Sequence, residues 1–153
     1  MTQYLKKNHT KQMVDVLNHI LGDTFTLYFK THAYHWNVEG PHFDTLHKLF
    51  GDQYTEMWTA MDDLAERIRA LGAYAPMNTA EILNSSDMKE AKKMIKAMDM
   101  VKDLAKDHEE ISKHMASAIE KASEVGDEVT ADMLIGRQTF HDKTAWMLRA
   151  TAS

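Results

Sequence analysis

Two histidines and two carboxylates in the first half of the chain are of the types that bind transition metals. His35 and His47 lie twelve residues apart, and Asp62 and Glu66 follow at helical spacing. Imidazole and carboxylate together make a ligand set suited to iron or zinc. In the alternative interpretation, the histidines cap helix ends and the carboxylates form surface ion pairs with basic neighbours. These neighbours are Lys48, Arg67 and Arg69.

The spacing of these four residues limits how they can meet at one ion. Asp62 and Glu66 share a face of one predicted helix, because four residues turn a helix by about 40° beyond a full turn. His47 belongs to the same helix but lies about four turns earlier. One helix therefore cannot bring all the ligands together, and a shared metal centre needs a second helix or a second chain.

Four apolar stripes predict the elements that must position these residues. Apolar side chains recur at three- and four-residue spacing in four long segments. The segments are 9–37, 43–71, 97–125 and 129–151, and a short helix is predicted at 79–84. Four long helices with a long crossover between the second and third describe an all-α, ferritin-like four-helix bundle.

A buried di-iron site of the usual kind is not expected in this bundle. Such a site uses two Glu-x-x-His motifs on facing helices. The only match runs from Glu39 to His42 and contains Pro41, so it lies in a turn rather than on a helix.

The composition indicates one helical domain. The chain has 153 residues with 2 prolines and 6 glycines, which favours helices. We expect a short polar tail at 1–8 and a single ferritin-like domain at 9–153. Without cysteine there is no disulfide and no thiolate ligand. No apolar signal core or membrane-length run is present, so we expect a cytoplasmic protein without a membrane partner.

The charge of the chain argues against strong attraction to nucleic acid. The formal net charge is −5, and phosphate binding requires a basic surface. A small cluster of Lys6, Lys7 and Lys11 near the N-terminus is the only counter-signal. We therefore expect DNA contact, and any nucleoid association, to be weak.

Three motifs carry a resemblance to a known family. They read H-W-N-V-x-G over His35–Gly40, F-x-x-L-H over Phe43–His47, and D-x-x-A-E-R-I-x-x-L-G over Asp62–Gly72. Together with the length, the helix pattern and the C-terminal Asp142 and Trp146, they resemble the Dps family, the DNA-binding proteins from starved cells. The resemblance covers nearly the whole chain.

The resemblance implies a function and a way to complete the ligand set. In Dps proteins the histidines of one subunit and the Asp/Glu pair of its neighbour meet at a two-fold interface. His35, His47, Asp62 and Glu66 would then bind iron in a hollow homododecamer. The cage would act as a ferroxidase, oxidising Fe(II) with hydrogen peroxide and storing Fe(III). Trp36 would accept an electron or radical from the metal centre, or anchor the interface.

Gly51 departs from the family pattern, which has an acidic ligand four residues after the second histidine. Asp52 and Asp44 are the candidates to replace that ligand. A helix-interior glycine costs about 1 kcal/mol relative to alanine, and the sequence reveals no structural gain from Gly51. The missing carboxylate would weaken Fe(II) binding and let zinc compete through the two imidazoles.

The acidic lead-in to the last helix also has two interpretations. Asp127 and Asp132 would stabilise the start of that helix by capping and by complementing its dipole. The resemblance instead implies that they line three-fold pores through which iron passes.

Two rival functions stay open. The first is a nucleoid protein that coats DNA. The second is a structural cage whose metal site has decayed, with Gly51 as the sign.

Overall fold

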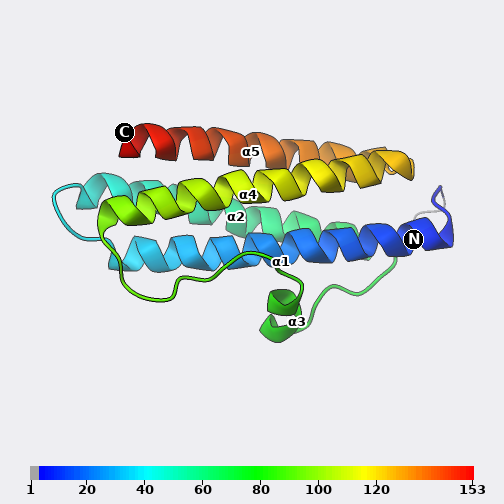
Figure 1. The fold of residues 1–153 in the computed structure, drawn as a ribbon. Helices are drawn as coiled ribbons and strands as arrows, with labels where there is room; N and C mark the ends of the chain where they lie inside the picture. The colour runs from blue at the N-terminus through cyan, green and yellow to red at the C-terminus, as the bar shows by residue number, and fades with distance from the viewer. Residues whose placement is uncertain (1–3) are drawn as a thin grey trace.

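All the regular secondary structure of residues 4–153 is helical. The computed structural model describes residues 4–153 (Figure 1). The helices are α1 (Lys7–Asn37), α2 (Phe43–Ala70), α3 (Thr79–Asn84), α4 (Ala97–Glu124) and α5 (Glu128–Ala152). The predicted all-α bundle with a short helix in the crossover is confirmed, and every predicted helix end agrees within two residues. Within residues 4–153, no helix is both long and apolar enough to cross a membrane.

The apolar stripes of the four long helices meet in one core. Helix α1 packs along α2, α4 packs along α5, and α1 also faces α4 (Figure 1). Leu17, Phe50, Leu64, Met115 and Leu148 are all fully buried. Burying one such side chain contributes roughly 1.5–3 kcal/mol, so the shared core holds the four helices as a rigid frame.

The crossover between α2 and α4 lies directly on α1, and α3 packs against that helix (Figure 1). Gly22 of α1 permits this close approach. A Cβ atom at this position would lie 2.6 Å from the carbonyl oxygen of Ile82 and 2.9 Å from the backbone nitrogen of Ser86. No side chain fits there unless the crossover shifts.

A buried ion pair joins α2 to the start of α5. Arg67 Nη2 lies 2.8 Å from Asp127 Oδ1, and the two side chains are 9% and 0% exposed. Asp127 is also the N-cap of α5, accepting from the backbone N–H of Thr130. The Tyr4 hydroxyl donates to the same carboxylate, so this part of the predicted tail contacts the bundle. Residues 1–3 of that tail lie outside the described part of the chain.

Candidate metal centre

His35 in the last turn of α1 and His47 near the start of α2 face each other across the turn between the helices. Their rings stack, with centroids 3.8 Å apart and an interplanar angle of 16°. His35 Nδ1 lies 2.6 Å from the carbonyl oxygen of His47, and His47 Nδ1 lies 2.8 Å from that of His35. A carbonyl only accepts, so each Nδ1 must carry the donated proton. Both Nε2 atoms are thereby left as acceptors, the form that binds a metal.

Gly51 makes room for this arrangement. A Cβ atom at Gly51 would lie 3.2 Å from Cε1 and 3.3 Å from Nδ1 of His35. The ring of His35 cannot retreat freely, because its Nδ1 is bonded to the carbonyl of His47. The structural gain from Gly51, which is not evident in the sequence, is space for the His35 imidazole. This contact joins two helices, so the local sequence does not reveal it.

Asp52 and Asp44 are the two candidates to replace the missing acidic ligand, and their carboxylates contact other groups or solvent. Asp52 is rotated about 100° around α2 from Gly51. Its carboxylate is 69% exposed and lies 3.1 Å from Lys48 Nζ. Asp44 is exposed in the first turn of α2, where an acidic side chain complements the helix dipole. Within residues 4–153, neither carboxylate forms a hydrogen bond or ion pair with His35 or His47.

Asp62 and Glu66 are exposed on α2 and lack partners in the described part of the chain. The three basic side chains expected to pair with Asp62 and Glu66 have other partners. Arg67 pairs with Asp127, Lys48 pairs with Asp52, and Arg69 donates to the carbonyl of Ala73. The surface ion-pair interpretation of Asp62 and Glu66 is therefore wrong, and within residues 4–153 neither carboxylate has a partner.

The two halves of the predicted ligand set lie far apart within one subunit. Helix α2 runs unbroken through His47, Asp62 and Glu66. Fifteen residues of helix separate His47 from Asp62, a rise of roughly 22 Å. One ion cannot bridge that distance, so the residues cannot form a single centre in one chain.

Comparison with known proteins identifies the family. A model of the ferritin-like domain family matches residues 14–153. The "DNA protection during starvation protein 2" of Bacillus anthracis is 41% identical over 140 residues, which cover 92% of this chain and 96% of the relative. The chain belongs to the Dps family of ferritin-like proteins.

Solved Dps structures share the fold. Dps from Staphylococcus aureus superposes with a TM-score of 0.90 at 40% identity, covering 94% of this chain and 96% of that one. Dps from Vibrio cholerae O1 has a TM-score of 0.92 at 28% identity, covering 97% and 94%. It is described as a member of a broad superfamily of ferritin-like diiron-carboxylate proteins. The predicted resemblance to the Dps family is thus confirmed.

An aromatic cluster connects Trp36 of this Dps chain to the histidine pair. Trp36 is 57% exposed and lies over His32, with ring centroids 4.1 Å apart. His32 stacks on Tyr54 at 3.8 Å, and Tyr54 lies 5.2 Å from His35. Burial lowers the pKa of His32, and the neighbouring imidazole of His35 lowers it further. Trp36 is placed to exchange electrons through this cluster or to anchor a partner, and both interpretations stay open.

The two pore candidates differ in exposure. Asp127 is fully buried between Arg67 and Thr130, so its carboxylate caps α5 and does not face an open channel within the subunit. Asp132 is exposed one turn into α5 and remains the candidate for lining a pore in this Dps protein.

Sequence reasoning missed a second cluster of ligand-type side chains. His19 and Asp23 of α1 converge with His114 of α4, and one ligand atom from each lies within 4.8 Å of the others. Two signals were present: the four-residue spacing of His19 and Asp23, and a carboxylate inside the apolar stripe of α1. His114 comes from another helix, which only the tertiary structure brings near.

Gly51 substitutions are expected to separate crowding from charge. Gly51→Ala adds a Cβ against the His35 ring and should slow Fe(II) oxidation about tenfold by displacing that imidazole. Gly51→Asp adds the same Cβ and a carboxylate, so it should bind Fe(II) more tightly and oxidise it faster than Gly51→Ala. Anaerobic Fe(II) titration and stopped-flow oxidation of the assembled protein measure both effects.

The matched control for Gly51 is Gly136→Ala on α5, where an added Cβ meets nothing within 4 Å. This variant measures the stability gained by replacing a helical glycine alone. Its rate of Fe(II) oxidation should equal that of the parent. Equal affinity and rate in Gly51→Ala and Gly51→Asp would mean that Asp52, Asp44 or water already fills the place of the carboxylate.

Proposed function

We propose that this Dps chain forms a hollow cytoplasmic homododecamer that oxidises Fe(II) with hydrogen peroxide and stores Fe(III) mineral, protecting the cell from oxidative damage. The observation that carries the proposal is the His35–His47 pair. Both Nδ1 protons are donated to backbone carbonyls, which leaves two neighbouring Nε2 atoms ready to bind the same substrate ion. Hydrogen bonds that set the outer nitrogen in this way are typical of histidines that bind metals.

The second half of the proposed site comes from a neighbouring subunit. Asp62 and Glu66 are exposed and unpaired within residues 4–153, and Asp62 lines a surface groove with Trp58 and Met61. Large aromatic side chains are exposed on the same helices, with Trp36 57% and Trp58 60% exposed. Exposed apolar surface of this kind marks contact sites between proteins. We therefore infer a two-fold contact through α1 and α2 that brings each carboxylate pair to the histidines of its neighbour.

This arrangement suits the oxidation of iron by peroxide. Two imidazoles and two carboxylates bind Fe(II), and the carboxylates offset the added charge as it becomes Fe(III). Two Fe(II) ions supply the two electrons that reduce one hydrogen peroxide to two water molecules, with two protons taken up. Consuming Fe(II) and peroxide together removes both reactants of hydroxyl-radical formation. Storage and protection are then one activity.

An anaerobic mixing experiment tests the proposed reaction. Fe(II) is added to the assembled protein, followed by hydrogen peroxide, and Fe(III) absorbance and residual peroxide are recorded. We expect rapid oxidation at two Fe(II) per peroxide, with the Fe(III) retained on the protein during gel filtration. A rate equal to that of protein-free buffer would favour the rival interpretation, a structural cage without a working site. Zinc added before iron should slow the reaction, because it competes for the imidazoles.

The nucleoid interpretation has less support. Of the three N-terminal lysines, Lys7 and Lys11 lie in α1, and Lys11 pairs with Asp15. With a net charge of −5 and about three phosphates neutralised at most, we expect no sub-micromolar shift of plasmid DNA at about 150 mM salt. A gel-shift series in increasing salt measures this. A shift that persists at this salt concentration would promote DNA coating to the main function.

A further inference from the structure

Asp23 is a buried carboxylate without a basic partner of the usual kind. Of the carboxylates described, only Asp23 and Asp127 have side chains that are fully buried. Asp127 pairs with the guanidinium of Arg67. Asp23 Oδ1 instead accepts from the Ser86 hydroxyl at 3.1 Å and from the backbone N–H of Asp87 at 2.8 Å. These two donors are neutral. The carboxylate therefore still needs a positively charged partner at Oδ2, because an uncompensated buried charge is costly.

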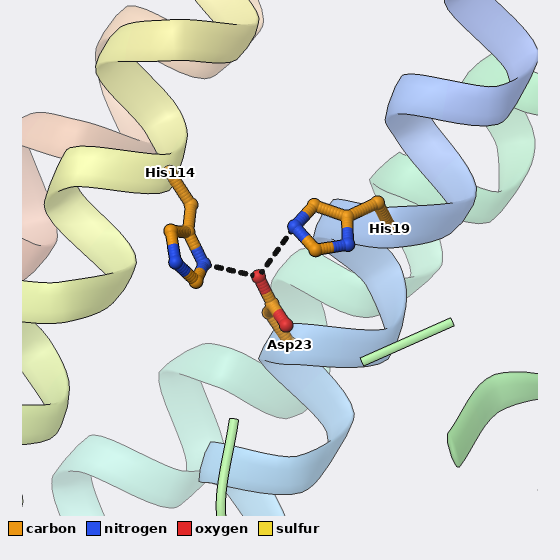
Figure 2. Close-up of side chains that lie close together, drawn as sticks. All are labelled: His19, Asp23 and His114. Atoms are coloured by element: carbon orange, nitrogen blue, oxygen red, sulfur yellow. Dashed lines mark hydrogen bonds and ion pairs between the residues drawn. The ribbon is translucent and has the colours of Figure 1, made fainter. Parts of the chain in front are cut away.

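Two imidazoles from different helices face that second oxygen (Figure 2). His19 Nε2 of α1 lies 3.3 Å from Asp23 Oδ2, and His114 Nδ1 of α4 lies 2.6 Å from it. Around a tetrahedral ion with bonds of about 2.0–2.1 Å, ligand atoms stand roughly 3.4 Å apart. The contact of His19 already has this spacing. The contact of His114 is a hydrogen bond that would lengthen as an ion entered between the three side chains.

The other ring nitrogen of each histidine has an acceptor of its own. His19 Nδ1 lies 2.9 Å from the carbonyl oxygen of Ser85, so it carries the proton and Nε2 is free to bind. His114 Nε2 lies 3.3 Å from Glu110 Oε1, which leaves Nδ1 directed at Asp23. Partners of this kind orient histidines that bind zinc. They are present here at both imidazoles.

A second carboxylate, from the crossover, borders this cluster of three side chains. Asp87 Oδ2 lies 3.4 Å from His19 Nε2, and its side chain is 73% exposed. It reaches this place because Gly22 lets the crossover lie directly on α1. A surface groove of about 560 Å³, lined in part by His19 and His114, opens the cluster to solvent.

We propose that His19, Asp23 and His114 form the core of a structural Zn²⁺ site, which the exposed Asp87 completes by turning its carboxylate toward the ion. The site would tie the crossover to α1 and α4. Two imidazoles and two carboxylates suit zinc better than magnesium or calcium, which prefer six or more oxygens. Four protein ligands close the coordination shell, as in structural rather than catalytic zinc sites. The site is distinct from the histidine pair, because His19 lies roughly 24 Å from His35 along α1.

The test is zinc binding by the assembled protein with the first histidine pair removed. In a His35→Ala/His47→Ala background, calorimetry with Zn²⁺ alone should show one strong site per subunit. Adding His19→Gln should weaken that binding by at least about 100-fold, since even outer-shell losses cost 10–100-fold. Asp87→Asn changes an exposed side chain and leaves the core untouched, and should weaken binding about tenfold. His9→Gln removes an imidazole elsewhere on α1 and should change nothing.

A second readout concerns the crossover itself. Zinc should slow hydrogen exchange in residues 79–88 of the background protein, and it should not do so in the His19→Gln protein. Light scattering confirms that every variant assembles like the parent. Absence of a strong zinc site in the background would overturn the proposal, as would equal binding by the His19→Gln and Asp87→Asn proteins. Tighter binding of Fe(II) than of Zn²⁺ at this site would overturn the assignment of zinc.

Discussion

Replacing His35 or His47 with alanine is expected to abolish rapid Fe(II) oxidation, with a loss of at least about 100-fold in rate. Each substitution removes one of the two imidazoles of the proposed iron site. The hydrogen bond that orients the remaining histidine goes to a backbone carbonyl, which alanine retains. The other imidazole therefore keeps its tautomer, and the loss reports one missing ligand. Most of the apolar core is untouched, so the assembly should stay intact.

Stopped-flow oxidation with peroxide measures this effect, and light scattering checks the assembly. The matched control is His42→Ala, because His42 is exposed at the start of α2 and its side chain makes no capping hydrogen bond. The control should oxidise Fe(II) at the parental rate. A His35→Ala or His47→Ala protein that does the same would show that this histidine has only a structural role.

Two inactive variants are expected to restore activity when they share a cage. One variant carries His47→Ala and keeps its carboxylates, and the other carries Asp62→Ala with Glu66→Ala and keeps its histidines. In a mixed two-fold pair, one of the two sites then combines intact histidines with intact carboxylates. Random mixing should recover about a quarter of the parental rate, since half of the pairs are mixed and each has one whole site.

Co-expression of the two variants with different affinity tags, followed by sequential purification, provides the mixed cages. Each variant expressed alone is the control and should stay inactive. No recovery in the mixed cages would mean that the site does not combine the two subunits in this way. A protein that light scattering shows to be a stable monomer, and that keeps full iron-oxidising activity, would also contradict the inter-subunit site.

The helices follow from local information in the sequence. Apolar residues at three- and four-residue spacing define each stripe, and Gly40, Pro41, Gly72 and Gly126 mark where helices end. These signals lie within a few residues of the elements they determine. For this reason the helix ends predicted at 37, 43 and 97 match the structure. The crossover helix at 79–84 was predictable for the same reason.

The site was predictable only in part. The types and spacing of His35, His47, Asp62 and Glu66 sufficed to exclude a centre built on one helix. They did not show which ring nitrogen of each histidine is free. That depends on the backbone carbonyl of the other helix, 2.6–2.8 Å away across the turn. The structural role of Gly51 likewise depends on the imidazole ring of His35, which another helix places against it.

Contacts between distant segments decided the remaining assignments. From the sequence alone, Asp127 could either face a pore or cap a helix. Its ion pair with the guanidinium of Arg67 on α2 shows that it is a buried helix cap. In the sequence, Asp23 is one carboxylate within an apolar stripe, and only the packing of α4 and the crossover brings His114 and Asp87 beside this part of α1. Local periodicity therefore determined the helices of this protein. Helix packing decided which polar groups are buried, paired or free to bind a metal, because these properties depend on residues that are far apart in the chain.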